Sequence, residues 1–266
     1  MAKVLIYNAP SSEPGKVLNK FGRWIPGEQL GICYVAAVLR QAGHQVELRD
    51  GFMHGLSARR VAAEINDRAD EFDVIGLSVS DGKVEGCIDT LNQLEGLSRK
   101  VHLTLGGHTA TLCAKEFLTQ FPRLDSVVRG EGEAPLSQLC RLLDDGSSWQ
   151  KTDGLSFRAN GAYFENPASA MEYAFDNLPF PDRDNLQHCL DSGFSPSIES
   201  SRGCKGVCSF CATRMMFQPR LGRLWRARSV KNVVDEVEIL VRLVPDERHG
   251  RVDAEDVALE RKPCRR

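Results

Sequence analysis

Three cysteines lie within eight residues of the chain, in the stretch SRGCKGVCSFCAT. Cys204, Cys208 and Cys211 are spaced Cys-x3-Cys-x2-Cys, and Gly203 and Gly206 give the loop the backbone freedom that wrapping a metal requires. Thiolates this close together predict a metal or cluster site. A closed structural zinc site usually takes four ligands, so a set of three leaves one coordination position open.

Three interpretations of the cysteine loop compete. A zinc site would need a fourth donor, and the nearest later donors are His249 and Cys264, in a stretch without a core pattern. Chance clustering is a second interpretation. The third is a 4Fe–4S cluster held by three thiolates, in which one iron keeps an open and therefore reactive position. The sequence favours this third interpretation.

The other cysteines within the patterned part of the chain are far apart, and several lie in apolar, helix-like stretches. They are Cys33, Cys87, Cys113, Cys140 and Cys189. We expect these five to be inert buried thiols, because free cysteine behaves as a small hydrophobic residue. Disulfides are not expected, since the chain shows no sign of export.

Composition restricts the class of protein. The chain has 266 residues, of which 42% are hydrophobic and 26% charged, and its formal net charge is −2. Nothing here suggests a nucleic-acid tail or a basic membrane face. The apolar run in MAKVLIYNAP is too short for a signal peptide, and no run of about 18 uncharged apolar residues follows. We expect a cytoplasmic protein with no nucleic-acid or membrane partner.

Strand and helix patterns alternate through residues 1–147. Gly43 is a natural helix C-cap and Ser57 a natural N-cap. Five such units predict an α/β domain with a doubly wound parallel sheet. The expected strands are 3–7, 44–50, 72–80, 100–107 and 124–130, and the expected helices are 30–43, 57–70, 83–98, 109–121 and 134–146.

Small and acidic residues follow the predicted strands. Glycine in one such turn is ordinary, but several of these loops on one edge of a sheet predict a ligand site, because ligands bind beyond the carboxyl ends of parallel strands. The candidate residues are Ser78, Ser80, Gly106, Gly107, Gly130, Glu131, Gly132 and Glu133.

The chain changes character after residue 147. Residues 148–194 read as a linker that holds a β-hairpin turning at residues 159–161, followed by an extended connector fixed by Pro179 and Pro181. A second domain, 195–266, opens with a short strand in 196–204 that leads into the cysteine loop. An amphipathic helix over 229–243, capped by Ser229, follows it.

The cysteine loop, with Phe210 before its last cysteine, resembles the signature of the radical S-adenosylmethionine (SAM) superfamily. The upstream stretches PGEQLGICYVAAVLRQAGHQVELRDG, GLSVSDG, LTLGGHTATLCAKEF and LDSVVRGEGEAPL resemble the Rossmann-like cobalamin-binding domain that precedes the radical SAM barrel in one large subgroup. The resemblance runs from about residue 1 to residue 243. It implies a partial β/α barrel that begins at residue 195.

The resemblance assigns roles by position. Cys204, Cys208 and Cys211 would hold a 4Fe–4S cluster, Phe210 would lie beside SAM, and the small-residue loops named above would cradle cobalamin. Glu131 and Glu133 have a second interpretation, as acids favoured at a helix N-terminus. The implied partners are a small-molecule substrate and an external electron donor of the flavodoxin or ferredoxin kind.

Two departures from the family pattern stand out. Many cobalamin domains give cobalt a histidine from a D-x-H-x-x-G loop, but Phe52 stands two residues after Asp50. We therefore expect no lower histidine ligand, and expect His54 to be a solvated loop residue. Residues 195–266 are also far fewer than the about 250 of a whole β/α barrel. The loss of pattern after Val244 predicts a truncated or frame-shifted end, with a genuinely short protein as the alternative.

The sequence thus predicts a cobalamin-dependent radical SAM methyltransferase. It would transfer a methyl group from SAM, through methylcobalamin, to an unactivated carbon or a phosphinate phosphorus, in an antibiotic or other natural-product pathway. A cobalamin-dependent radical cyclase and a non-catalytic cofactor-binding fragment are the alternatives. A methylthiotransferase is disfavoured, because Cys33, Cys87 and Cys113 do not form the second cysteine trio that it would need.

Overall fold

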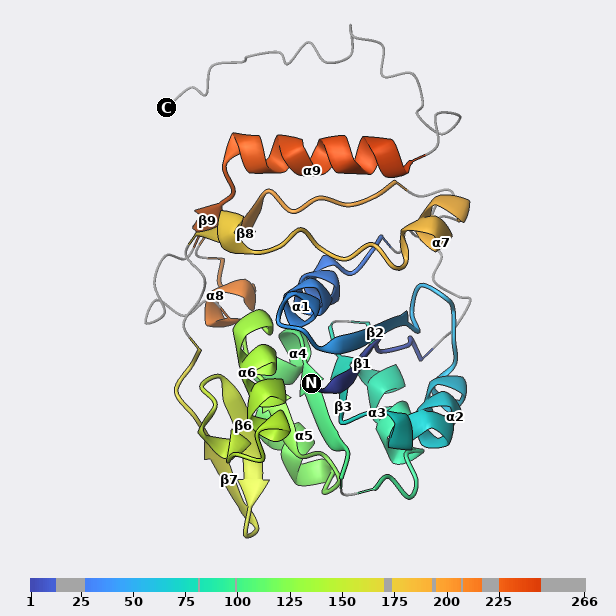
Figure 1. Cartoon of the computed structure of the whole chain (residues 1–266). Helices are drawn as coiled ribbons and strands as arrows, with labels where there is room; N and C mark the ends of the chain where they lie inside the picture. The colour runs from blue at the N-terminus through green and yellow to red at the C-terminus, as the bar shows by residue number, and fades with distance from the viewer. Residues whose placement is uncertain are drawn as a thin grey trace, which may run out of the picture.

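A seven-stranded sheet with helices on both faces forms the larger part of the molecule (Figure 1). The computed structural model describes residues 1–12, 27–80, 82–98, 100–169, 174–192, 195–206, 208–216 and 225–244. The segment from residue 174 onward lies across one end of this sheet domain, with the last helix outermost (Figure 1).

The sheet has the order β2-β1-β3-β4-β5-β6-β7. Its first five strands are parallel, and the strand order reverses between β1 and β3, as in other doubly wound sheets. This confirms the predicted sheet. The strands are β1 (Lys3–Asn8), β2 (Gln45–Asp50), β3 (Val74–Ser78), β4 (His102–Gly106), β5 (Ser126–Val128), β6 (Leu155–Ala159) and β7 (Ala162–Glu165).

The predicted hairpin is β6 and β7, which add antiparallel strands to the edge of the same sheet. Asn160 and Gly161 turn the chain with φ of 51° and 78°. Two consecutive positive φ values give the tight turn whose twist matches that of the flanking strands. The hairpin that the sequence places in a linker therefore extends the first sheet, while the domain boundaries at residues 147 and 194 stay predictions.

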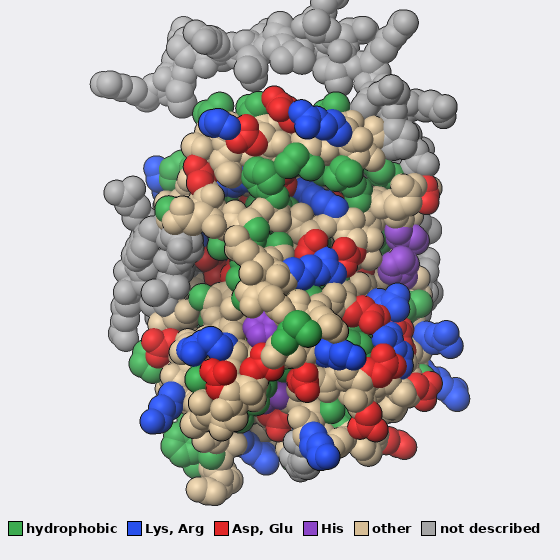
Figure 2. Space-filling view, in the orientation of Figure 1, with side chains coloured by type: hydrophobic (Ala, Val, Ile, Leu, Met, Phe, Trp, Pro, Cys, Tyr) green, Lys and Arg blue, Asp and Glu red, His purple; other side chains and the backbone are tan. Residues whose placement is uncertain are grey.

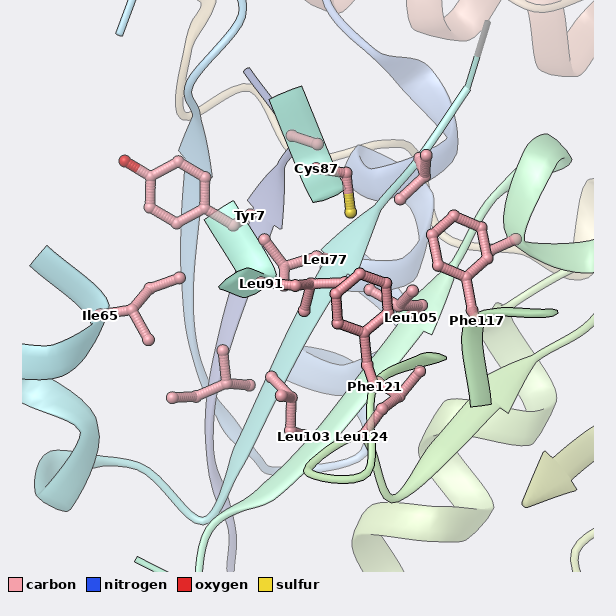
Figure 3. Close-up of a cluster of buried hydrophobic side chains, with 14 of the residues drawn as sticks. Tyr7, Ile65, Leu77, Cys87, Leu91, Leu103, Leu105, Phe117, Phe121 and Leu124 are labelled. Atoms are coloured by element: carbon pink, nitrogen blue, oxygen red, sulfur yellow. The ribbon is translucent and has the colours of Figure 1, made fainter. Parts of the chain in front are cut away.

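Helices cover both faces of the sheet. Alternate residues of each strand point to opposite faces, so β1 sends Val4 and Ile6 toward α1 and α6 but Leu5 and Tyr7 toward α2, α3 and α5. Figure 3 shows this second cluster around Leu103 and Leu105. The helices are α1 (Leu30–Gln41), α2 (Ala58–Arg68), α3 (Val84–Asn92), α4 (His108–Leu112), α5 (Ala114–Gln120), α6 (Glu133–Asp144), α7 (Leu186–Asp191), α8 (Thr213–Met216) and α9 (Val230–Leu243). Short 3-10 turns occupy Ala69–Glu71, Trp149–Lys151 and Phe175–Asn177.

Two predicted helices were wrong in extent. The helix expected over 83–98 ends at Asn92. Beyond that residue, the Asn66 side chain of α2 supplies the hydrogen bonds that a longer helix would make within itself: it donates to the Gln93 carbonyl oxygen at 3.0 Å and accepts from the Glu95 N–H at 3.1 Å. The helix expected over 109–121 is broken at Cys113, where φ is −117° and ψ is 31°. The break lets α4 stay at the end of β4 while α5 turns back to pack on the core.

The predicted caps are confirmed. Gly43 has a φ of 89° and follows α1. Ser57 Oγ accepts a hydrogen bond from the Arg60 N–H at 3.3 Å, and Ser229 Oγ accepts one from the Asn232 N–H at 3.2 Å. These bonds satisfy donors that a helix leaves free in its first turn.

The segment after the connector is small. The strand predicted in 196–204 is confirmed over its last part, as β8 (Ser201–Gly203), which pairs antiparallel with β9 (Trp225–Ala227). In the described ranges, β8 has no parallel neighbour of the kind a barrel would supply. The residues after Val244, His249 and Cys264 among them, lie outside the described residues.

The surface mixes charges of both signs on the face that Figure 2 shows. Exposed hydrophobic residues gather on α9, where Val230, Val234, Val237 and Val241 are spaced along one stripe. No helix in the described part of the chain is long and apolar enough to cross a bilayer.

Candidate cofactor site

A cavity of about 690 Å³ opens at the carboxyl edge of the sheet. On one side are the ends of the central strands and the first residues of α1 and α6, and on the other side is the segment around the cysteine loop. Every small or acidic loop residue that the sequence analysis selected lines this cavity: Ser78, Ser80, Gly106, Gly107, Gly130, Glu131, Gly132 and Glu133. Phe210 and Cys211 line the opposite wall.

The cavity continues between the sheet and the helices α1 and α6. Its floor is Gly76 in the middle of β3, flanked in register by Ile6 and Thr104 of the neighbouring strands. A Cβ atom at Gly76 would lie 3.6 Å from Thr104 Cγ2, an ordinary contact, so the absent side chain leaves space and relieves no clash. Glycine weakens a strand interior, and here it opens a slot that a flat group can enter.

Gly107 brings two backbones together at the edge of the cavity. Its φ is 92° and its ψ is −178°, a region open essentially to glycine alone. A Cβ atom there would lie 2.6 Å from the Val79 carbonyl oxygen. The loops after β3 and β4 therefore meet closely, and the Thr109 N–H donates to Val79 O at 3.2 Å.

A chain of buried polar side chains lies behind the floor. His102 Nε2 lies 2.9 Å from Ser126 Oγ, and Ser126 Oγ donates to Thr104 Oγ1 at 2.9 Å. The Thr104 hydroxyl donates to the Ser126 carbonyl oxygen at 3.1 Å. Burial lowers the pKa of His102 to about 4, so the ring is neutral at pH 7. Because these polar groups form hydrogen bonds with one another, Thr104 can turn its methyl group toward Gly76, which keeps the cavity floor apolar.

The two glutamates of the loop after β5 are held by arginines. Arg202 of β8 donates to Glu133 at 2.7 Å and lies 3.6 Å from Glu131, and Arg226 of β9 also pairs with Glu131. Burial raises the pKa of Glu131, although the two arginines oppose this. Glu133 is also in the first turn of α6, as its second interpretation requires. Direct contacts from these carboxylates to cobalamin stay a prediction.

The three cysteines of the loop are exposed. The Gly206 N–H donates to Cys204 Sγ at 3.2 Å, and a Cβ atom at Gly206 would lie 3.2 Å from that sulfur and 3.8 Å from Cys208 Sγ. Two of the sulfurs thus gather around one glycine. The Cys211 sulfur lies 3.3 Å from the Thr213 hydroxyl, and this hydrogen bond lowers the pKa of the Cys211 thiol.

The donor chemistry fits an iron–sulfur cluster, since three accessible thiols on one short loop, at the rim of a cavity, are the ligands such clusters take. Across the described ranges, no three His, Cys, Asp or Glu side chains are already close enough to share one metal ion. Closing around a cluster would therefore require the loop to adjust. The assignment of Phe210, 90% exposed at the cavity wall, to SAM stays a prediction.

The remaining candidates lie elsewhere. His54 is exposed, stacks on His188 with 4.0 Å between ring centroids, and is not among the residues that line the cavity. Cys33, Cys87, Cys140 and Cys189 are buried, whereas Cys113 is half-buried. Burial raises the pKa of Cys87 and of Cys140 to about 12, as expected for inert thiols.

Sequence reasoning missed Gly76, Thr104, Glu199 and Arg202 as cavity residues. One signal for Gly76 was available, because a glycine inside an apolar strand often marks a close approach by a ligand or another backbone. Arg202 gave no such signal, since its partners are distant in sequence.

Comparison with known proteins agrees with this geometry. Residues 26–140 match the family model of the B12 binding domain. An uncharacterized methyltransferase of Pyrococcus horikoshii is 28% identical over 217 residues, which cover 80% of this chain and 46% of the relative. An anaerobic magnesium-protoporphyrin IX monomethyl ester cyclase of Synechocystis is 28% identical over 242 residues, which cover 88% of this chain and 46% of the cyclase.

The same fold is seen in a solved structure of OxsB, a cobalamin-dependent SAM radical enzyme with aqua-cobalamin and SAM bound. The TM-score is 0.72 at 22% identity, covering 91% of this chain and 32% of OxsB. The chain spans about half the length of the curated relatives it matches.

The residues that match the B12 binding domain model include strands β2 to β5 of the doubly wound sheet. These similarities agree with the resemblance to a cobalamin-binding domain drawn from the sequence, and the chain shares its fold with a cobalamin-dependent SAM radical enzyme.

Proposed function

We propose that this chain binds cobalamin in the cavity and a 4Fe–4S cluster on Cys204, Cys208 and Cys211, as part of a cobalamin-dependent radical SAM methyltransferase. One observation carries the proposal. A single cavity is lined by the sheet-edge loops on one side and by Phe210 and Cys211 on the other, so both cofactors would face one space.

The chain's own residues would do three things. The slot over Gly76, with its apolar floor, would take the flat benzimidazole base of cobalamin's nucleotide tail and exclude water from it. The backbone at Gly106 and Gly107 would approach the corrin closely. The three thiolates would hold the cluster at the rim while leaving one iron free for SAM. When bound, the cofactors would supply the radical chemistry and the methyl carrier.

The relatives support two reactions. The Pyrococcus protein is named as a methyltransferase and the Synechocystis protein as a cyclase. Further relatives include a hopanoid C-3 methylase of Methylococcus capsulatus, 29% identical over 228 residues. Methyl transfer to an unactivated carbon or a phosphinate phosphorus is our first choice, and cyclisation is the second. An outside electron donor of the flavodoxin or ferredoxin kind and a small-molecule substrate complete the proposal, with a natural-product pathway as its setting.

The test is anaerobic reconstitution of the chain with iron, sulfide and cobalamin, followed by SAM and a strong reductant. We expect 5′-deoxyadenosine above the level made by a Cys204→Ala, Cys208→Ala, Cys211→Ala variant. Transfer of a labelled methyl group from SAM to cobalamin, and then to product, would distinguish a methyltransferase from a cyclase. An intact cluster that yields no 5′-deoxyadenosine would contradict radical SAM activity in this chain.

A further inference from the structure

Arg202 lies at the meeting point of the cavity and the cysteine loop. It belongs to β8, two residues before Cys204, and is only 8% exposed. Its guanidinium carbon lies against two neighbouring buried rings, 4.8 Å from the centroid of Tyr34 and 4.6 Å from that of Phe175, whose centroids are 5.8 Å apart. A planar cation held against two aromatic rings at once has little freedom to move.

Three carboxylates surround the same guanidinium group. Arg202 donates to Glu133 at 2.7 Å and to Glu199 at 2.9 Å, and lies 3.6 Å from Glu131. Glu131 belongs to the loop after β5 and Glu133 is the first residue of α6, and both line the cavity, whereas Glu199 precedes β8. The contacts therefore join the sheet domain directly to the strand that leads into the cysteine loop.

Arg226 repeats the link from the neighbouring strand. It is the register partner of Arg202 in the β8–β9 pair and also reaches Glu131. Arg202 of β8 and Arg226 of β9 thus both pair with carboxylates at the loop after β5, which lines the cavity.

We infer that Arg202 is a positioning residue, which fixes the cysteine loop relative to the cobalamin cavity and so sets the spacing of the two cofactors. The inference rests on the proposed function for the identity of those cofactors. The contacts that join the cysteine loop to the cavity involve only side chains of this chain, so they can be tested without any cofactor. Lysine cannot replace Arg202, because a single ammonium group cannot lie flat against two rings and also bond three carboxylates.

The variants are Arg202→Met, Arg202→Lys and Glu133→Gln in the full chain, with Arg40→Met as the matched control. Arg40 also joins the sheet domain to a later segment, pairing with Asp182 at 2.7 Å and Asp184 at 2.6 Å. It touches neither β8 nor the cavity loop. Glu133→Gln keeps the side-chain size and removes the charge that Arg202 pairs with. It therefore replaces Arg202→Met as the test variant if Arg202→Met does not fold.

The first measurement is hydrogen–deuterium exchange of the chain without cofactors. We expect residues 201–206 to exchange at least tenfold faster in Arg202→Met and Arg202→Lys than in the wild type, while peptides from β1 and β3 keep their rates. Arg40→Met should leave 201–206 unchanged. Wild-type rates in 201–206, or equal acceleration throughout the chain, would overturn the inference.

The second measurement is electron paramagnetic resonance of the loaded chain with cob(II)alamin and a reduced cluster. We expect the wild type to show magnetic interaction between the two centres. Arg202→Met should keep both cofactors in full amount but show a weaker or heterogeneous interaction, and an unchanged interaction would refute the spacing role. If the wild type binds neither cofactor, the proposed function fails, and the exchange measurement still decides whether Arg202 positions the loop.

Discussion

Single residues in this chain carry structural roles that their types alone do not reveal. His102 is neutral and hydrogen-bonded inside the sheet, away from any catalytic role. Gly76 weakens its strand, because glycine has no side chain to pack, yet it opens the cavity floor. Both assignments depend on neighbours from other strands, and each gives a measurable prediction.

His102 should make stability depend on pH. Its pKa is lowered to about 4 in the folded state, below its ordinary value of 6.5. Between these pH values the unfolded chain binds one more proton, so the free energy of unfolding should rise with pH from 4 to 6.5, by about 3 kcal/mol for this group. In a His102→Gln variant, urea unfolding should lose that part of the slope. An identical slope in variant and wild type would show that His102 titrates normally.

Gly76 should control cobalamin binding by size. Because a Cβ atom at Gly76 makes only an ordinary contact, Gly76→Ala should fold normally, and Gly76→Val should also fold while filling the slot. We expect cobalamin affinity to fall slightly for Ala and at least tenfold for Val, in equilibrium titration followed by absorbance. The thermal midpoint of each apo variant is the control. Equal affinities across the series would place the nucleotide tail elsewhere.

At the scale of elements, the junction between β4 and α4 shapes the cavity edge. Gly107 combines a positive φ with a site where a Cβ atom would lie only 2.6 Å from a backbone oxygen, and the kink at Cys113 keeps α4 beside the cavity. Neither feature follows from helix or strand propensity. Gly107 is needed because the loops after β3 and β4 lie within hydrogen-bonding distance of each other, and the kink at Cys113 lets α5 turn back to pack on the core.

The clash at Gly107 predicts a difference between two glycines. Gly146 also has a positive φ, of 64°, but a Cβ atom there meets nothing within 4 Å. Gly146→Ala should cost about 1 kcal/mol of unfolding free energy from backbone strain alone. Gly107→Ala should cost more, about 2–4 kcal/mol, because the Val79 backbone must also move. Equal losses in urea unfolding would show that the loop adjusts freely.

At the scale of the whole molecule, a second buried ion network holds the later segment against the sheet domain. Arg183 of the connector pairs with Glu28 and with Glu236 of α9, both at 2.5 Å, and Arg228 also pairs with Glu236. Glu236 is 1% exposed. Removing one partner of a buried network leaves the others uncompensated, which costs more than the pair itself contributes.

Glu236→Leu should therefore lower the unfolding free energy by about 3–5 kcal/mol. Lys231→Ala is the control on the same helix, since Lys231 is 83% exposed and pairs with Asp235 across one turn. The control should leave the urea midpoint almost unchanged. A small effect of Glu236→Leu would mean that water replaces the lost carboxylate.

The sequence by itself determined the alternation of strands and helices, the caps at Ser57 and Ser229, the hairpin turn at Asn160 and the cysteine spacing, because each depends on residues close together in the chain. It also placed the cavity loops at one sheet edge, since parallel strands end on the same side. Only the tertiary structure decided the cavity floor at Gly76, the helix break at Cys113 and the ion pairs of Arg202 with Glu131 and Glu133. These depend on contacts between segments far apart in sequence, whose geometry is set by packing and which no local pattern encodes.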